Sequence, residues 1–193
     1  ESQLSAPGQV EYGRADQACA WMLLAKLYLN AEVYTGTPRN TECVTYCNKI
    51  IDAGYSLVGN YEHLFTADNG PAYKNEVIFS INFDGISTTT YGGTNFIIHA
   101  AIGGDMDPLS YGISGGWGGT RTTSALVNKF EPGDPRGMFF TEGQSLEIED
   151  ISNFNDGYAV TKFTNKTSTG EDGSSLEFVD TDFPMFRLAD VYL

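Results

Sequence analysis

The residues of this chain best suited to contact a ligand are aromatic rings set among glycines, in residues 82–123. This stretch holds ten of the 22 glycines of the chain, and Tyr91 and Trp117 lie within it. Glycine lets the backbone turn tightly but supplies no side chain that could bury a neighbouring ring. A large ring left exposed in this way usually contacts something. The pattern predicts a loop system that contacts a ligand, held by scaffold segments before and after it.

A sugar is the ligand that best fits this combination of residues. A pyranose has an apolar C–H face that packs on an aromatic ring, and its hydroxyl groups bond to amide and hydroxyl side chains. Asn, Thr and Ser residues surround both candidate rings, most densely in residues 88–95 around Tyr91. We therefore predict that Tyr91 and Trp117 bind the ligand. The alternative, that one or both rings cap the local core, is as favourable for Tyr91 and less so for Trp117.

A serine nucleophile is the first catalytic possibility in the same stretch. Residues 112–116 read Gly-Ile-Ser-Gly-Gly, which matches the pattern of a nucleophile elbow. That elbow needs a strand before its serine and a histidine after it. No convincing strand precedes Ser114, and both histidines, His63 and His99, come earlier in the chain. The match is interpreted as an accident of a glycine-rich loop.

Pairs of acidic residues leave a glycoside hydrolase open as an alternative function. Such an enzyme uses two carboxyl groups roughly 5–9.5 Å apart. Asp105 with Asp107, and Glu147 with Glu149 and Asp150, are the groups available, but acids close together in loops are more often solvated or cation-binding than catalytic. No phosphate-binding loop, zinc-protease helix or dinucleotide fingerprint is present. We expect no catalysis and no required cofactor.

Charge and cysteine content narrow the possible partners and ions. The 193 residues carry 25 acidic and 11 basic side chains, a net charge of −14 that argues against a nucleic-acid partner. Acidic loops could hold a structural calcium ion, for which Asp68 is the candidate. The three cysteines are expected to be small buried thiols. Asn165 begins an Asn-Lys-Thr glycosylation sequon by pattern only.

Two helices are predicted before the glycine-rich stretch. Residues 15–34 are apolar on more than one face, so this helix should pack between neighbours. Trp21, Leu24, Ala25 and Tyr28 fit the first-helix pattern of a tetratricopeptide unit, and residues 41–53 form the second helix. A generic helical hairpin fits equally well. A protein-docking helical scaffold is therefore a further alternative function.

Shorter elements follow this hairpin. Strands are expected over residues 76–83 and near 158–164, a strand or buried helix over 96–102, and helices over 124–130 and from 183 onward. The organisation predicted is a lead-in with a helical hairpin (1–56), a loop-rich region that contacts the glycan (57–181), and the start of another scaffold helix (182–193). We expect the chain to be part of a longer protein, because the last helix would end without a cap.

Five segments together resemble the SusD/RagB family of glycan-binding outer-membrane lipoproteins. They are residues 13–30, 75–82, 115–119, 134–136 and 183–193, which occur in the family's order over almost the whole chain. The resemblance implies a mainly α fold, a superhelix of tetratricopeptide-like hairpins with a large loop-rich insertion containing short strands.

The resemblance also implies a function without catalysis. Such a protein would be lipid-anchored at the cell surface, would bind starch-like α-glucan oligosaccharides, and would deliver them to a TonB-dependent outer-membrane transporter. Tyr91 and Trp117 match positions where the family uses aromatic contacts. The lipid anchor and the remaining aromatic contacts would lie in an N-terminal part outside this chain. Family members can also carry structural calcium.

Overall fold

Helices are the longest regular elements of this protein, and its strands are few and short. The computed structural model describes the whole chain, residues 1–193, and divides it into two units. We call residues 1–59, 70–81 and 184–193 the helical unit, and residues 60–69 and 82–183 the loop unit. The two strand pairs form separate two-stranded sheets, and no sheet closes. This agrees with the predicted mainly α fold with short strands in a loop-rich region. The predicted boundaries near residues 56 and 181 stay a prediction.

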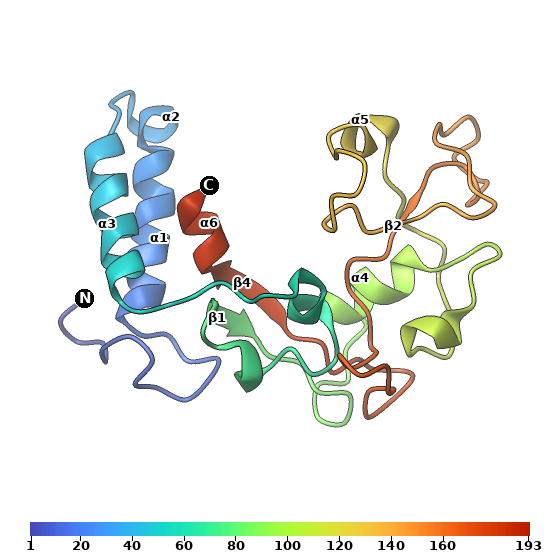
Figure 1. Ribbon diagram of the computed structural model, residues 1–193, viewed down its shortest axis with the longest axis horizontal. Helices are drawn as coiled ribbons and strands as arrows, with labels where there is room; N and C mark the ends of the chain where they lie inside the picture. The colour runs from blue at the N-terminus through green and yellow to red at the C-terminus, as the bar shows by residue number, and fades with distance from the viewer. The chain divides into compact units, whose positions relative to one another are not determined.

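A hairpin of helices is the main regular structure of the helical unit (Figure 1). Its helices are α1 (Gln17–Leu29), the short α2 (Ala31–Thr35) and α3 (Asn40–Asp52). Asp16 caps α1 by accepting a hydrogen bond from the backbone N–H of Cys19, and Gly36 ends α2 in the left-handed conformation. The predicted single helix over residues 15–34 is thus two helices, divided at Asn30. Ala18, Met22 and Ala25 are buried on α1.

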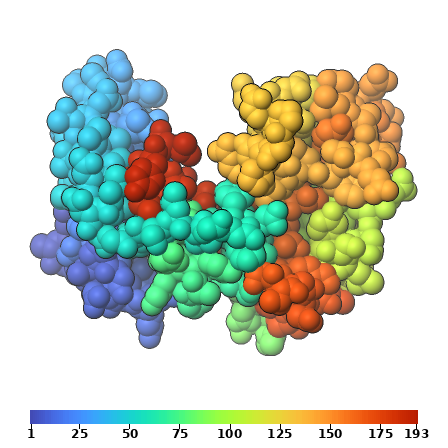
Figure 2. Space-filling model, in the orientation of Figure 1, coloured from blue at the N-terminus to red at the C-terminus, as the bar shows by residue number.

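The C-terminal residues complete the core of the helical unit. β1 (Val77–Ile81) pairs with β4 (Phe183–Arg187), and α6 (Leu188–Tyr192) follows directly. Ile50, Ile78 and Leu188 are buried together with residues of α1. Figure 2 shows the C-terminal residues, in red, against the cyan residues of this unit. The core therefore joins segments that are far apart in the sequence.

The prediction that residues 183–187 begin a helix was wrong. These residues form β4, which hydrogen-bonds to β1, and Arg187 forms an ion pair of 2.9 Å with the buried Glu76. Pro184 is compatible with a strand here, because each strand of a two-stranded sheet has an unpaired side where a proline needs no N–H. Pairing with a distant strand overrides the local pattern.

Not all of α1 is packed between neighbours as predicted. Its buried face contacts α3, whereas Leu23, Leu27 and Leu29 are 52%, 47% and 64% exposed. These three leucines therefore face outward. The reason is that α3 and the C-terminal segment cover only one side of α1.

The loop unit is made of short elements joined by long loops. They are the 3₁₀ turns η1 (Tyr61–Phe65) and η3 (Pro108–Tyr111), helices α4 (Gly93–Ala101) and α5 (Ser124–Val127), and strands β2 (Phe139–Phe140) and β3 (Ala159–Val160). The turn η2 (Pro71–Tyr73) lies in the helical unit. The segment that could have been strand or helix is therefore helix α4. The predicted helix over 124–130 and strand over 158–164 are present but shorter.

Buried amide side chains replace regular secondary structure in the loop unit. Its apolar core is formed by Ile98, Ile102, Met106, Ile113, Ala159 and Val179. Around it, Asn69 and Asn165 are 2% and 0% exposed. Asn69 donates to the carbonyls of Leu64 and Asp182, and Asn165 donates to those of Gly112 and Ser175. These bonds satisfy loop backbone groups that a sheet would otherwise pair.

Candidate functional site

Tyr91 and Trp117 lie next to each other, although 26 positions separate them in the sequence. Their ring centres are 6.1 Å apart, with an angle of 56° between the planes. The two residues are 60% and 43% exposed. Both rings are therefore accessible to a ligand, and binding by Tyr91 and Trp117 stays a prediction.

Two further rings extend this pair. Phe96 of α4 has its ring centre 6.0 Å from that of Trp117, and Phe178 has its ring centre 5.3 Å from that of Tyr91. Phe96 is 48% exposed, and Phe178 is partly buried. We call Tyr91, Phe96, Trp117 and Phe178 the aromatic surface. Phe178 had no signal in the sequence, because it is distant in the chain and only the fold brings it here.

The end of helix α4 holds the Trp117 loop in place. The backbone N–H of Trp117 donates to the carbonyl of His99, that of Gly118 to Ile102, and that of Gly119 to Ala100, at 2.8–2.9 Å. The last carbonyls of a helix have no partners within the helix and need them from elsewhere. Residues 117–119 supply these partners, so the loop is also the C-terminal cap of the helix.

Several glycines occur in this loop because the backbone packs closely there, and not because a neighbouring ring must be left exposed. A Cβ atom on Gly116 would lie 2.2 Å from the carbonyl oxygen of Ile102, and one on Gly103 would lie 2.6 Å from the Cα of Gly118. A side chain at either position would push the loop away from α4. Gly115 is different, since nothing lies within 4 Å of its Cβ position. The glycines thus bring the backbone, and Trp117 with it, against the helix.

His99 supports Trp117 from beneath. The imidazole is 3% exposed and stacks on the indole, with ring centres 4.8 Å apart and planes 22° apart. Its Nδ1 lies 2.7 Å from the carbonyl oxygen of Gly115, so Nδ1 carries the proton and donates it. Sequence reasoning used His99 only to argue against a nucleophile. Its spacing of three residues from Phe96 on one helix is a signal that could have placed both near Trp117.

The polar edge of the aromatic surface is formed by Glu177. Its carboxylate accepts a hydrogen bond of 2.9 Å from the hydroxyl of Tyr91. This bond and the negative charge of Glu177 raise the pKa of Tyr91. The carboxylate fixes the direction of the Tyr91 hydroxyl and keeps a second acceptor oxygen for a ligand hydroxyl. The arrangement can stack on apolar sugar faces and bond to sugar hydroxyls, with no nucleophile within it.

The serine motif does not form a nucleophile elbow. Ser114 donates its backbone N–H to Leu176, and residues 114–123 contain no helix after the serine. The nearby His99 has its Nδ1 directed to the carbonyl of Gly115. The structure supports reading this motif as an accident.

Three residues of the acidic pairs, Asp105, Asp107 and Asp150, accept hydrogen bonds from groups in the loops. Asp107 accepts hydrogen bonds from the backbone of Leu109 and the hydroxyl of Ser110 at the start of η3. Asp105 accepts one from Asn155, and Asp150 accepts two from Ser152. These bonds give Asp105, Asp107 and Asp150 a part in holding the loops together.

Asp68 is held by hydroxyl and amide groups. Its carboxylate accepts hydrogen bonds from the hydroxyl of Thr66 and from both the N–H and the hydroxyl of Ser168, and these bonds lower its pKa against the opposing effect of burial. No three His, Cys, Asp or Glu side chains gather as a metal-binding group in the chain. Calcium at Asp68 stays a prediction.

The exposure of the Asn165 sequon and of the three cysteines tests two further expectations from the sequence. The amide of Asn165 is fully buried and bonded, so the sequon is closed to a glycosylating enzyme in the folded unit. The cysteines are free and only partly buried, which corrects the expectation of buried thiols. They lie on helices that each have an exposed face.

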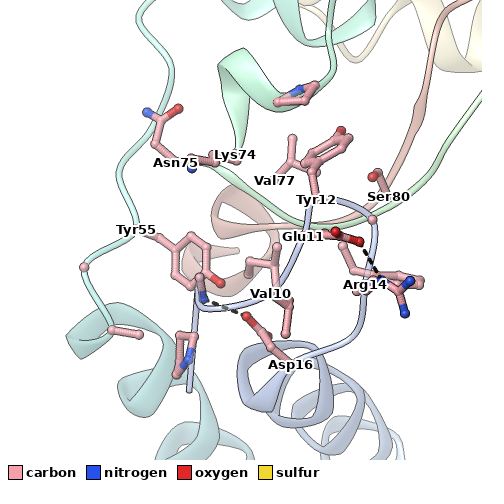
Figure 3. A pocket seen from close by; sticks show the side chains of 18 residues that line it. Val10, Glu11, Tyr12, Arg14, Asp16, Tyr55, Lys74, Asn75, Val77 and Ser80 are labelled. Atoms are coloured by element: carbon pink, nitrogen blue, oxygen red, sulfur yellow. Dashed lines mark hydrogen bonds and ion pairs between the residues drawn. The ribbon is translucent and has the colours of Figure 1, made fainter. Parts of the chain in front are cut away.

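A cavity of about 490 Å³ lies in the helical unit, away from every predicted site residue. Figure 3 shows Val10, Tyr55 and Val77 around it. Its Asp16 carboxylate accepts the backbone N–H of Gly8, and Arg14 pairs with Glu11. These polar groups stabilise the lead-in loop, and burial beside Asp16 raises the pKa of Tyr55.

Sequence comparison with known proteins relates this chain to one of them. No family model matches it. The sequence is 30% identical to the starch-binding protein SusD of Bacteroides thetaiotaomicron, over an alignment that covers all of this chain and 44% of SusD. The chain is a relative of SusD over its whole length. This match confirms the family predicted from the five sequence segments.

Solved structures show the same fold. Surface glycan-binding protein A from Bacteroides thetaiotaomicron matches 98% of this chain and 44% of its own, with a TM-score of 0.66 and 19% identity. The same protein in complex with laminarihexaose gives 0.66 at 20% identity over 97% of this chain. A SusD-like protein from Bacteroides fragilis gives 0.54 at 18% over 99% of this chain. The chain spans 44% of the length of each of these named proteins.

The helices of this chain are all too short or too polar to span a lipid bilayer.

Proposed function

We propose that this chain supplies part of a non-catalytic glycan-binding site, in which the aromatic surface stacks on a sugar chain. The observation that carries the proposal is the exposed pair Tyr91 and Trp117, fixed to α4 by the backbone of residues 117–119. Rigid rings bind at low entropic cost, because they are already ordered before the ligand arrives. The relation to a starch-binding protein and the shared fold with a laminarihexaose-binding protein support this reading.

The ligand we propose is a starch-like α-glucan. The ring of Tyr91 is tilted by 56° to that of Trp117 and by 49° to that of Phe178, which suits a curved chain better than a flat one. The net charge of −14 favours a neutral sugar at this surface. Glu177 and the threonines before Tyr91 would bond to the sugar hydroxyls.

We further propose that the whole protein acts at the outer membrane through a lipid anchor and passes its glycan to a TonB-dependent transporter. This rests on the relation to SusD.

Calorimetric titration with maltoheptaose and with laminarihexaose tests the ligand. We expect maltoheptaose to bind more tightly, and Trp117→Ala and Tyr91→Ala each to weaken it at least tenfold. Tyr34→Ala is the matched control, because Tyr34 is 69% exposed but lies on α2, outside the loop unit. Unchanged affinity in both ring variants would remove the aromatic surface as the site.

A further inference from the structure

A second cavity, of about 430 Å³, lies in the loop unit and has an unusual wall for so acidic a chain. Nine residues line it, from η1, from α5 and the residues after it, from β2 and the loop before it, and from β3 and the residues after it. Among them are three of the 11 Lys and Arg residues of the chain and none of its 25 Asp and Glu residues. We call it the basic cavity.

Two of its three cations have no carboxylate partner. Arg136 is paired with Asp134, but neither Lys129 nor Lys162 takes part in any ion pair of the chain. The ammonium group of Lys162 lies 4.2 Å from the ring centre of Phe65 and 5.5 Å from that of Tyr61. The rings hold the ammonium group in place and leave its N–H groups for an anion.

The same wall presents flat apolar faces. Tyr61, Phe130 and Phe139 line the cavity, and the last two form an edge-to-face pair with ring centres 5.3 Å apart. A volume of about 430 Å³ is typical of sites for small molecules. An inorganic anion would use the lysines but not the rings, whereas a sugar ring that carries a carboxylate would use both.

We infer that the basic cavity binds an acidic saccharide unit, a pyranose bearing a carboxylate. The carboxylate bonds to Lys129 and Lys162, and the ring packs on the aromatic wall. None of these residues belongs to the aromatic surface. The inference therefore goes beyond the proposed function, and either can fail without the other.

Calorimetry on the full chain with trigalacturonate, maltotriose and inorganic sulfate tests the inference at low ionic strength. We expect trigalacturonate to bind, and Lys162→Met and Lys129→Met to weaken it about tenfold each, since both keep the side-chain stem and remove the charge. Binding should also weaken as salt is added. Lys74→Met is the matched control, because it changes the net charge equally at an exposed position in the helical unit.

Several outcomes would overturn the inference. Failure of trigalacturonate to bind at millimolar concentration is one, and affinity that survives both lysine substitutions is another. If sulfate binds as tightly as trigalacturonate, the cavity binds anions and does not recognise the sugar. Equal affinity for maltotriose, lost in the same variants, would show that the carboxylate has no part in recognition.

Discussion

The imidazole of His99 lies stacked under the indole of Trp117, with ring centres 4.8 Å apart. The backbone carbonyl of His99 also accepts a hydrogen bond from the backbone N–H of Trp117. The side chain also donates to the carbonyl of Gly115, so one buried residue holds Trp117 by two contacts and the loop just before it by a third. His99 thus acts as a positioning residue for the exposed indole of Trp117.

Replacing His99 separates these contacts. His99→Phe keeps a stacked ring but leaves the Gly115 carbonyl unpaired, so we expect a loss of about 1–3 kcal/mol in the free energy of unfolding. His99→Asn keeps a donor near the position of Nδ1 but loses the stack. Urea denaturation measures stability, and the near-ultraviolet circular dichroism of Trp117 reports its surroundings.

The chain has two tryptophans, so Trp21→Phe is the background in which the Trp117 signal is read alone. If His99→Phe and His99→Asn both leave that signal and the glucan affinity unchanged, His99 does not position Trp117.

Gly116 and Gly115 form a matched pair for the close approach of the loop to α4. A Cβ atom on Gly116 would meet the Ile102 carbonyl at 2.2 Å, so Gly116→Ala should lower the free energy of unfolding by about 1–3 kcal/mol and weaken glucan binding. Gly115→Ala meets nothing and should change stability by less than about 1 kcal/mol. Urea denaturation compares the two, and equal losses would contradict the packing argument.

Asn165 is expected to be among the most sensitive positions of the loop unit. Asn165→Ala leaves the carbonyls of Gly112 and Ser175 and the N–H of Asp180 without their partner. Each unpaired buried group costs about 1–3 kcal/mol, so the loss should exceed about 2 kcal/mol. Asn48→Ala, at an exposed position of α3, is the control. A small loss at Asn165 in thermal unfolding would show that the loops do not depend on its amide.

The pH dependence of the Asp134 and Arg136 pair follows from its geometry. Three side-chain hydrogen bonds from the guanidinium group, helped by the Arg136 N–H, lower the pKa of Asp134 to about 2. Because the folded pKa lies below the ordinary value, the pair stabilises the turn fully above about pH 4 and loses this effect as the pH falls through about 2.

Carbon-13 NMR of the Asp134 carboxyl group measures this pKa directly. Arg136→Gln should raise it towards the ordinary Asp value of 3.8. A titration midpoint that is the same in both proteins would show that the pair does not form in solution.

The helical hairpin and the exposure of Tyr91 and Trp117 were predictable, because periodicity and glycine-flanked rings are local signals. The pairing of β1 with β4 was not, since Pro184 and the apolar residues after it favour a helix until a distant strand offers hydrogen bonds. Phe178 was missed for a related reason. Its place beside Tyr91 depends on buried Asn side chains, such as Asn95, which accepts the N–H of Val179.

Trp117 is attached to the end of a helix, because the amides of residues 117–119 are bonded to the carbonyls of α4. The backbone of residues 117–119 cannot move away from the helix without breaking that cap, and the stack on His99 holds the ring, so we expect no opening or closing step before contact with a sugar. Association with different glycans should then proceed at similar rates. Preference among them will appear in how long each one stays bound.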